Sequence, residues 1–488
     1  MEWVIANMAP LMFGALVLFL LFGYPVAFAL AANGIVFGLI GIELGLLQPA
    51  LFQALPERIF GIMANDTLLA IPFFTFMGLI LERSGMAEDL LDTIGQLFGP
   101  MRGGLAFAVI FVGALLAATT GVVAASVISM GLISLPIMLR YGYDKRLASG
   151  VIAASGTLAQ IIPPSLVLII MADQLGRSVG DMYEGAMVPG LVLTGLYVGY
   201  VALLTIIKPN AAPALPPEAR TLRGFKLAIR VLTTLVPPLL LIFLVLGTIF
   251  LGIATPTEGG AMGAAGALIM AIVRKRLSWK LLKQAMETTG KLSSFVVFIL
   301  VGSTVFGLVF RAVNGDLWVE HLLLSLPGGQ LGFLIVVNIL VFLLAFFLDF
   351  FELSFIIVPL LAPVADKLGI DLIWFGVLLA VNMQTSFMHP PFGFALFYLR
   401  SVAPASIKTT DIYWGAIPFV CIQIIMVAII IIFPNIVSYG DPAEKARIDA
   451  QGEVDLNTLM QQEDGAAKGA PTEDSAAELL KNLQSESK

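Results

Sequence analysis

The chain has 488 residues, of which 59% are hydrophobic and only 12% are charged. In soluble globular proteins about a quarter of all residues are charged, so this composition excludes a water-soluble protein. The formal net charge of −6 resides in residues 441–488, which hold 11 acidic and 5 basic residues, and the rest of the chain is neutral.

Apolar stretches of membrane-spanning length recur from residue 4 to residue 433, so we expect a multi-pass membrane protein in a lipid bilayer, without a nucleic-acid partner. No basic stretch precedes the first apolar run, which favours a retained first helix over a cleaved signal peptide. The single cysteine, Cys421, excludes a disulfide framework within the chain. Residues 436–488 are acidic and polar, and we expect them to be a disordered tail.

The sequence contains two copies of one unit. An ungapped shift of 227 positions aligns six identical prolines, glycines and aspartates, among them Pro136 with Pro363 and Pro163-Pro164 with Pro390-Pro391. Proline and glycine fix backbone shape, so matches at these residues indicate a repeated fold. We assign residues 1–210 to the first repeat, 211–230 to a basic cytoplasmic linker, and 231–435 to the second repeat.

Each repeat begins with two helices, an amphipathic arm and a third helix. The stretch 4–42 divides at Gly23-Tyr24-Pro25, because its counterpart divides into 231–252 and 257–273. The predicted arms are 47–58 and 278–287, and the predicted third helices are 61–81 and 291–311.

A hairpin and an interrupted helix follow in each repeat, before a final helix. The hairpins, 104–140 and 331–366, are apolar with polar residues near the middle, which predicts two half-length helices meeting at a polar tip inside the membrane. The interrupted helices, 147–172 and 372–399, are each broken by a polar run that ends in Pro-Pro. The expected fold is therefore an all-α polytopic membrane protein with inverted repeats, two re-entrant hairpins and two interrupted helices.

Charge predicts the orientation. With ten crossings and two hairpins, one face receives 18 of the 22 Lys and Arg residues outside the tail, including Arg274-Lys275-Arg276. The positive-inside rule makes this face cytoplasmic and both termini periplasmic. The two repeats then have opposite orientations in the membrane.

Inverted repeats with broken helices place substrate and ion sites where the breaks meet. Hydroxyl and carbonyl oxygens suit a hard cation such as sodium, and free helix N-termini suit anions. We predict a sodium ion near Ser155, Thr157, Asp349 and Thr385. The full set of predicted substrate and ion residues is Thr119, Thr120, Ser126, Ser155, Thr157, Pro163, Pro164, Ser165, Asp349, Asn382, Gln384, Thr385, Ser386, Pro390 and Pro391.

Some roles stay open at this point. Each hydroxyl could instead bond within its own helix. Asp349 could bind sodium, relay a proton or cap a hairpin helix, and we expect His389 to be a hydrogen-bonded structural residue. An enzyme is not expected, because the chain has no HExxH zinc motif and no GxxxxGK[ST] phosphate loop.

Several stretches resemble the large membrane subunit of tripartite ATP-independent periplasmic (TRAP) transporters. They are Leu69-Ala-Ile-Pro-Phe-Phe, Gly142-Tyr-Asp-Lys, Ala153-Ala-Ser-Gly-Thr-Leu, Ile162-Pro-Pro-Ser165, Ala254-Thr-Pro-Thr-Glu258, Phe347-Leu-Asp349 and Gly369-Ile-Asp371. The resemblance implies an elevator carrier that uses a sodium gradient, has no cofactor, and imports an organic acid across the bacterial inner membrane. It also implies a periplasmic solute-binding protein and a small four-helix membrane subunit as partners.

The second break departs from the usual pattern of this family. Ser386-Phe-Met-His389-Pro-Pro-Phe-Gly stands where Gly-x-x-Thr-Pro-Pro-x-Gly is usual, and it is similar to a subgroup linked to 2-oxo acids and related carboxylates. A stand-alone sodium–carboxylate symporter of the same architecture is the alternative reading.

Overall fold

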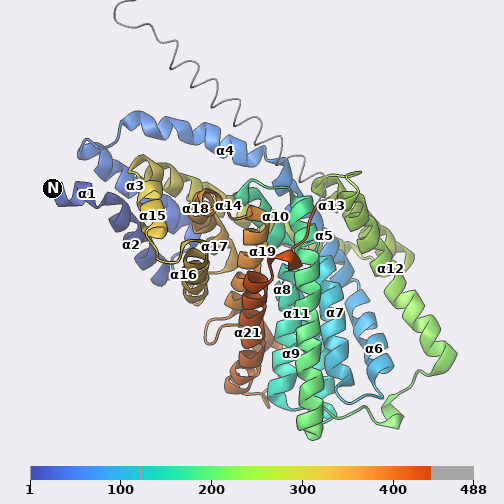
Figure 1. Cartoon of the computed structure of the whole chain (residues 1–488). Coiled ribbons are helices and arrows are strands. Elements are labelled where there is room, and N and C mark those ends of the chain that lie inside the picture. Colours follow the sequence, from blue (N-terminus) through green and yellow to red (C-terminus); the bar gives the residue numbers. More distant parts are fainter. Residues whose placement is uncertain (1, 121–122, 441–488) are drawn as a thin grey trace, which may run out of the picture. The chain divides into compact units, whose positions relative to one another are not determined.

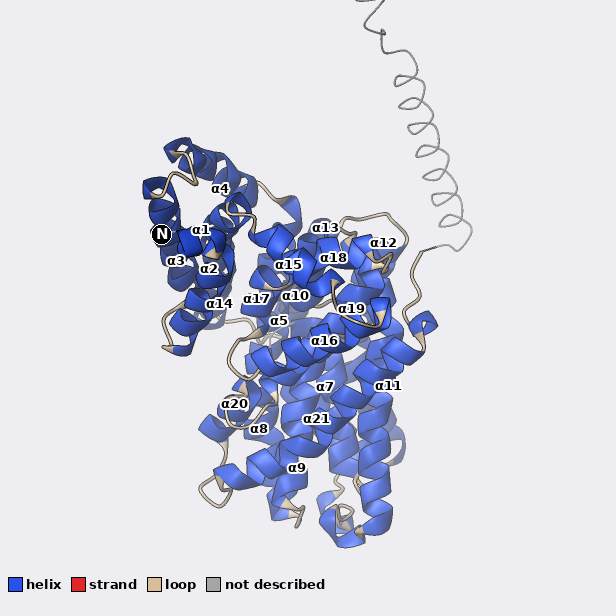
Figure 2. Ribbon diagram, turned by 60° about the vertical axis from the view of Figure 1, so that its left-hand side comes forward, coloured by secondary structure: helices blue, strands red, loops and turns tan. Residues whose placement is uncertain are grey.

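The computed structural model describes residues 2–120 and 123–440, with the side chains of 117–120 left out. The described residues up to Ser438 form one unit of helices joined by short loops, without β-strands in that part of the chain (Figures 1 and 2). The predicted all-α polytopic fold is confirmed. The predicted disordered tail lies outside the described residues, apart from its first few positions.

The helices follow the same order in both halves of the chain. After the short α1 (Glu2–Ala6), the first half contains α2 (Met8–Leu21), α3 (Val26–Glu43), α4 (Leu55–Met63), α5 (Ala70–Arg83), α6 (Met86–Phe98), α7 (Gly104–Thr120), α8 (Val123–Arg140), α9 (Lys145–Thr157), α10 (Leu166–Leu175) and α11 (Val179–Ile207). The second half contains α12 (Gly224–Phe250), α13 (Pro256–Val273), α14 (Trp279–Ala312), α15 (Gly315–Leu324), α16 (Gly329–Leu344), α17 (Phe350–Ile356), α18 (Val358–Lys367), α19 (Leu372–Met383), α20 (Phe394–Val402) and α21 (Thr409–Ile432).

The two halves pack against each other in matched pairs. Helix α3 packs on α14 and α5 packs on α13, and a shift of 227 residues converts one pair into the other. The interrupted helix α9 packs on the final helix α21, and its counterpart α19 packs on α11. Each of these contacts therefore has an equivalent contact in which the two repeats have exchanged roles. A two-fold axis between the repeats requires this.

Several predicted boundaries are wrong. The segments 278–287 and 291–311 are not an arm and a separate helix but one continuous helix, α14. Thr288-Thr289-Gly290 stand between them, and the one glycine costs only about 1 kcal/mol in a helix. In the first repeat the predicted helix 61–81 is broken instead. The Asn65 side chain accepts a hydrogen bond from Thr67 N at 2.9 Å and ends the α4 arm at that point.

Two helices were missed and one begins early. The predicted elements include neither α6 nor α15, and α6 buries Leu90, Leu91 and Ile94 on one face. Helix α12 begins at Gly224, inside the predicted linker 211–230, because Phe225-Lys-Leu-Ala-Ile-Arg230 continues its helical pattern.

Seven described helices are long and apolar enough to cross a bilayer, and two bent pairs raise this number to nine by length and composition. Each segment of the interrupted helices is too short to be counted in this way. Helix α8, with 18 residues, also passes this test of length and composition, and the re-entrant course of the first hairpin stays a prediction. Large apolar side chains such as Phe243 of α12, 73% exposed, face outward as expected for contact with lipid.

Glycines let the first hairpin approach the first interrupted helix closely. A Cβ atom on Gly113 of α7 would lie 2.5 Å from the Cβ atom of Ser155 in α9. A Cβ atom on Gly156 would lie 2.3 Å from Val127 of α8. Only residues without a side chain fit at these two crossings, and they hold the hairpin against the break.

The Tyr143 side chain, in the loop between α8 and α9, links the two ends of the same hairpin. The Tyr143 hydroxyl oxygen accepts a hydrogen bond from Leu105 N at 3.2 Å. Burial raises the pKa of Tyr143 to about 12, so the phenol keeps its proton even in alkaline solution in which a free tyrosine begins to ionise.

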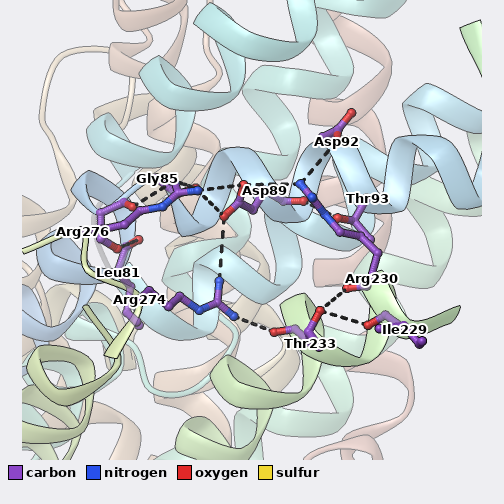
Figure 3. A network of polar contacts seen from close by, with 11 residues as sticks. Leu81, Gly85, Asp89, Asp92, Thr93, Ile229, Arg230, Thr233, Arg274 and Arg276 are labelled. Atoms are coloured by element: carbon purple, nitrogen blue, oxygen red, sulfur yellow. Dashed lines mark hydrogen bonds and ion pairs between the residues drawn. The ribbon is translucent and has the colours of Figure 1, made fainter. Parts of the chain in front are cut away.

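At the basic face, one carboxylate joins both repeats (Figure 3). Asp89 of α6 forms ion pairs with Arg276 at 3.0 Å, with Arg230 of α12 at 3.7 Å, and with Arg274, which follows α13, at 3.9 Å. Arg274 also donates to the Thr233 carbonyl oxygen at 2.7 Å. Since the Asp89 side chain is only 20% exposed, this network ties three helices together more firmly than a fully exposed ion pair would.

Candidate functional site

The first break lies between α9 and α10. Helix α9 ends in a short 3-10 turn, Leu158–Gln160, and the chain then passes through the buried Pro163-Pro164 before α10 begins. Ser165 caps α10, because its Oγ accepts a hydrogen bond from Leu168 N at 3.4 Å and donates to the Gln160 carbonyl oxygen at 2.5 Å. The role of Ser165 is therefore local to the break.

The second break has the same construction between α19 and α20. Helix α19 continues into a 3-10 turn, Gln384–Phe387, which precedes Pro390-Pro391. The Asn382 Nδ2 donates to the carbonyl and side-chain oxygens of Asn338 in α16, at 2.8 and 2.9 Å. This anchors the second break to the second hairpin.

The two breaks touch each other. Gln384 Nε2 donates a hydrogen bond to Thr157 Oγ1 at 3.0 Å, and both side chains are fully buried. The two residues are 227 positions apart, so they are equivalent in the two repeats. This bond therefore lies where the axis between the repeats passes through the protein.

A pocket of about 300 Å³ lies where the hairpins and the breaks converge. The tip of the first hairpin contributes Val123 and Ala124, and that of the second contributes Asp349, Phe350 and Phe351. The breaks and the half-helices after them contribute Gln160, Leu166, Val167, Phe387, Phe394 and Tyr398, and α14 closes the pocket with Leu292 and Phe295.

Equivalent positions of the two repeats face each other across this pocket. Adding 227 converts Val123 into Phe350, Ala124 into Phe351, Gln160 into Phe387 and Val167 into Phe394, and all eight residues line it. The pocket therefore lies on the axis between the repeats. Its two sides differ chemically, because each small or polar residue of the first repeat is matched by a phenylalanine of the second.

Asp349 lines this pocket and also caps α17. Its Oδ1 accepts a hydrogen bond from Glu352 N at 2.9 Å, and Glu352 Oε2 accepts one from Asp349 N at 3.0 Å. This capping box accounts for both carboxylates structurally. A role in binding sodium remains a prediction beside the capping role.

Four buried side-chain oxygens at the breaks have no hydrogen-bond partner among the described residues. They belong to Ser155, Gln160, Gln384 and Ser386. Buried polar atoms are normally satisfied, so a group of unpaired oxygens suits a ligand that accepts lone pairs. Oxygen atoms of this kind are the ligands that a hard cation prefers.

The other predicted residues are placed less decisively. Thr119 and Thr120 end α7, and their side chains lie outside the described residues. Ser126 is buried in α8, and Thr385 Oγ1 donates to the Asn382 carbonyl oxygen at 2.6 Å, within its own helix. Pro391 is exposed, whereas Pro163 and Pro164 are buried, so the second Pro-Pro pair lies nearer the surface.

His389 is buried, which agrees with the structural role expected of it. Its ring stacks on Phe346 with 4.2 Å between centroids and meets the edge of Phe342 at 4.4 Å, and the backbone of Ala345 is its polar neighbour. Aromatic packing holds this histidine in place.

Sequence reasoning missed the aromatic wall of the pocket and the position of Gln160 in its lining. Gln160 was visible as part of the polar run at the first break, and the 227-residue shift pairs it with Phe387. In a membrane protein, phenylalanines line pockets and also face the lipid. The sequence alone therefore does not show which of them form a pocket wall.

Comparison with known proteins agrees with this architecture. Residues 13–436 match the family model described as "Tripartite ATP-independent periplasmic transporter, DctM component". The chain is 30% identical to the C4-dicarboxylate TRAP transporter large permease protein DctM of Pseudomonas aeruginosa over 80% of this chain and 90% of the relative. The DctM protein of Vibrio cholerae is also 30% identical, over 84% of this chain and 92% of its own length.

Other relatives are named for other substrates. The sialic acid TRAP transporter permease protein SiaT of Haemophilus influenzae is 28% identical over 79% of this chain and 62% of its own length. Among solved structures, the Alcanivorax borkumensis YdaH transporter has a similar fold, with a TM-score of 0.56, 15% identity, and coverage of 86% of this chain and 98% of that one. The named relatives are permeases rather than enzymes. The chain belongs to the DctM family, the large permease subunits of tripartite ATP-independent periplasmic transporters.

Proposed function

We propose that the chain is the large subunit of a sodium-coupled, binding-protein-dependent transporter that imports an organic acid by an elevator mechanism. The pocket at the repeat axis is the observation that carries this proposal. Both hairpin tips and both breaks line it, and secondary transporters of inverted-repeat architecture bind their cargo at such junctions.

Sodium coupling is supported by the chemistry of the breaks. The side-chain oxygens of Ser155, Gln384 and Ser386 are buried and unpaired. Gln384 forms the bond with Thr157, and each serine lies two positions along the chain from one of these two residues. Sodium is the co-transported ion here, held by neutral oxygens at the breaks, with the Asp349 carboxylate at the neighbouring hairpin tip.

The elevator mechanism is supported by how the pocket is enclosed. Hairpins and broken helices form most of its wall, and only Leu292 and Phe295 of α14 complete it. Helix α14 packs most extensively on α3, and it meets the second hairpin through α17. If the hairpins and broken helices slid together along α14, they would carry the pocket from one face of the membrane to the other.

Family membership supports the partners and the location. We propose a periplasmic solute-binding protein and a small four-helix membrane subunit as partners, the bacterial inner membrane as location, and periplasmic termini. The basic face around Asp89, Arg230 and Arg276 is then cytoplasmic.

Reconstitution tests the proposal. Vesicles containing this chain and its small subunit should accumulate a radiolabelled 2-oxo acid only when sodium enters down its gradient and the binding protein is outside. Full uptake without the binding protein would support the stand-alone symporter instead. Equal uptake in a potassium gradient would contradict sodium coupling.

A further inference from the structure

We infer that the cargo of this pocket is an acid with one carboxylate and an apolar body, of aryl or branched-alkyl type, held between Gln160 and the phenylalanines of the second repeat. This inference rests on the proposed function, because it takes the pocket as the cargo site. It adds the substrate class and the residues that select it.

The second repeat provides an aromatic wall. Phe350 and Phe351 follow the hairpin tip, Phe387 ends the 3-10 turn of the break, and Phe394 begins α20. Phe295 of α14 meets Phe351 edge to face, with 5.7 Å between ring centroids. Such a wall binds apolar and flat groups through buried area and ring contacts.

The first repeat provides the polar end. Gln160 is 1% exposed, lines the pocket, and has an unpaired side-chain oxygen. A primary amide carries two N–H donors as well, which suit a carboxylate or a keto oxygen. Its equivalent in the other repeat is Phe387, so the axis places a polar group opposite an apolar one.

A second carboxylate would have no cationic side chain to meet. No lysine, arginine or histidine is among the described residues that line the pocket, and the undescribed stretch 121–122 is Gly-Val. A sodium ion near Asp349 could balance the charge of one cargo carboxylate. A second carboxylate would be buried against phenylalanine with no positive charge to balance it, which disfavours a C4-dicarboxylate.

The chain suits a cysteine-protection test, because Cys421 is its only cysteine. Ala124→Cys in a Cys421→Ser background places a thiol on the pocket wall, in the complex with a cysteine-free small subunit. The rate of maleimide labelling is measured in sodium buffer against increasing phenylpyruvate, 4-methyl-2-oxopentanoate or succinate. Binding in the pocket slows the labelling.

We expect phenylpyruvate and 4-methyl-2-oxopentanoate to protect the thiol at concentrations at least about tenfold lower than succinate, since each buried methylene changes binding by about 10-fold or more. Phe387→Ala, or Phe351→Leu if the first variant does not fold, should reduce this ratio. Gln160→Leu should weaken protection by all three acids. Phe298→Ala is the matched control, because Phe298 lies on α14 but lines a different cavity.

Two failures can be distinguished. Protection by succinate at equal or lower concentration would overturn the inferred substrate class and leave the pocket as the cargo site. Absence of protection by every acid, in a complex that elutes as a single folded species, would contradict the pocket as cargo site and the inference with it.

Discussion

Asp349 combines two roles that a single substitution can separate. Its side chain caps α17 through Glu352 N, and it also faces the pocket between the repeats. Asparagine caps helices as well as aspartate does, but it carries no charge. The cap and the charge can therefore be tested independently.

We expect Asp349→Asn to raise the sodium concentration for half-maximal uptake by at least about tenfold, while the unfolding midpoint stays unchanged. A formal charge about 4 Å from a cation contributes about 4 kcal/mol even at an effective dielectric constant of 20. The measurement is initial uptake against sodium concentration in proteoliposomes.

Asp349→Ala is the matched comparison, because it removes the cap as well as the charge. It should lower stability by about 1 kcal/mol and affect sodium dependence as the asparagine variant does. A sodium curve for Asp349→Asn that overlays the unmodified protein would assign Asp349 to the structure of the hairpin alone.

At this scale the sequence predicted positions better than roles. Thr157 and Gln384 were predicted as site residues, and the structure joins them by a hydrogen bond. The local partners of Ser165 and Thr385 could not be predicted, because a hydroxyl bonded to its own backbone and one turned toward an ion have the same sequence.

Among the elements, the first hairpin depends on its close approach to the first interrupted helix. We expect Gly113→Ala to lower stability by about 1–3 kcal/mol, because the added methyl group would overlap Ser155. It should also reduce uptake, since α7 leads to the tip beside the pocket. The measurements are thermal unfolding in detergent and initial uptake rate.

Gly199→Ala in α11 is the control. Nothing lies within 4 Å of a Cβ atom at Gly199, so alanine there should be neutral or stabilise by up to about 1 kcal/mol through helix propensity. Equal stability of both variants would contradict the tight crossing of α7 and α9.

The sequence predicted elements well where proline and glycine mark their ends. The division at Gly23-Tyr24-Pro25 is confirmed by α2 and α3, and both Pro-Pro pairs lie in breaks. The existence of α6 could have been read in the same way, because Gly85 precedes this helix and Gly99-Pro100 follows it. The continuity of α14 could not, because Gly290 lies at the predicted division and the helix passes through it. Packing against neighbouring helices decides there.

For the folded unit as a whole, the central feature is the axis between the repeats. The 227-residue shift, derived from prolines and glycines, also relates the contacting helix pairs, the Thr157–Gln384 bond and four residue pairs around the pocket. The repeated fold could be predicted because the prolines and glycines that shape the backbone recur at the same spacing in both repeats. The chemistry of the pocket could not, because the repeats have diverged there into small and aromatic sides.

The central claim is that this pocket is carried across the membrane, and sided labelling of Ala124→Cys in the Cys421→Ser background tests it most directly. The complex is reconstituted in one orientation, and a membrane-impermeant maleimide is added to one side at a time, with and without sodium. The account predicts that the thiol is reached from each side, and that sodium changes the ratio of the two labelling rates. Labelling from one side only under every condition, in vesicles that transport normally, would contradict it.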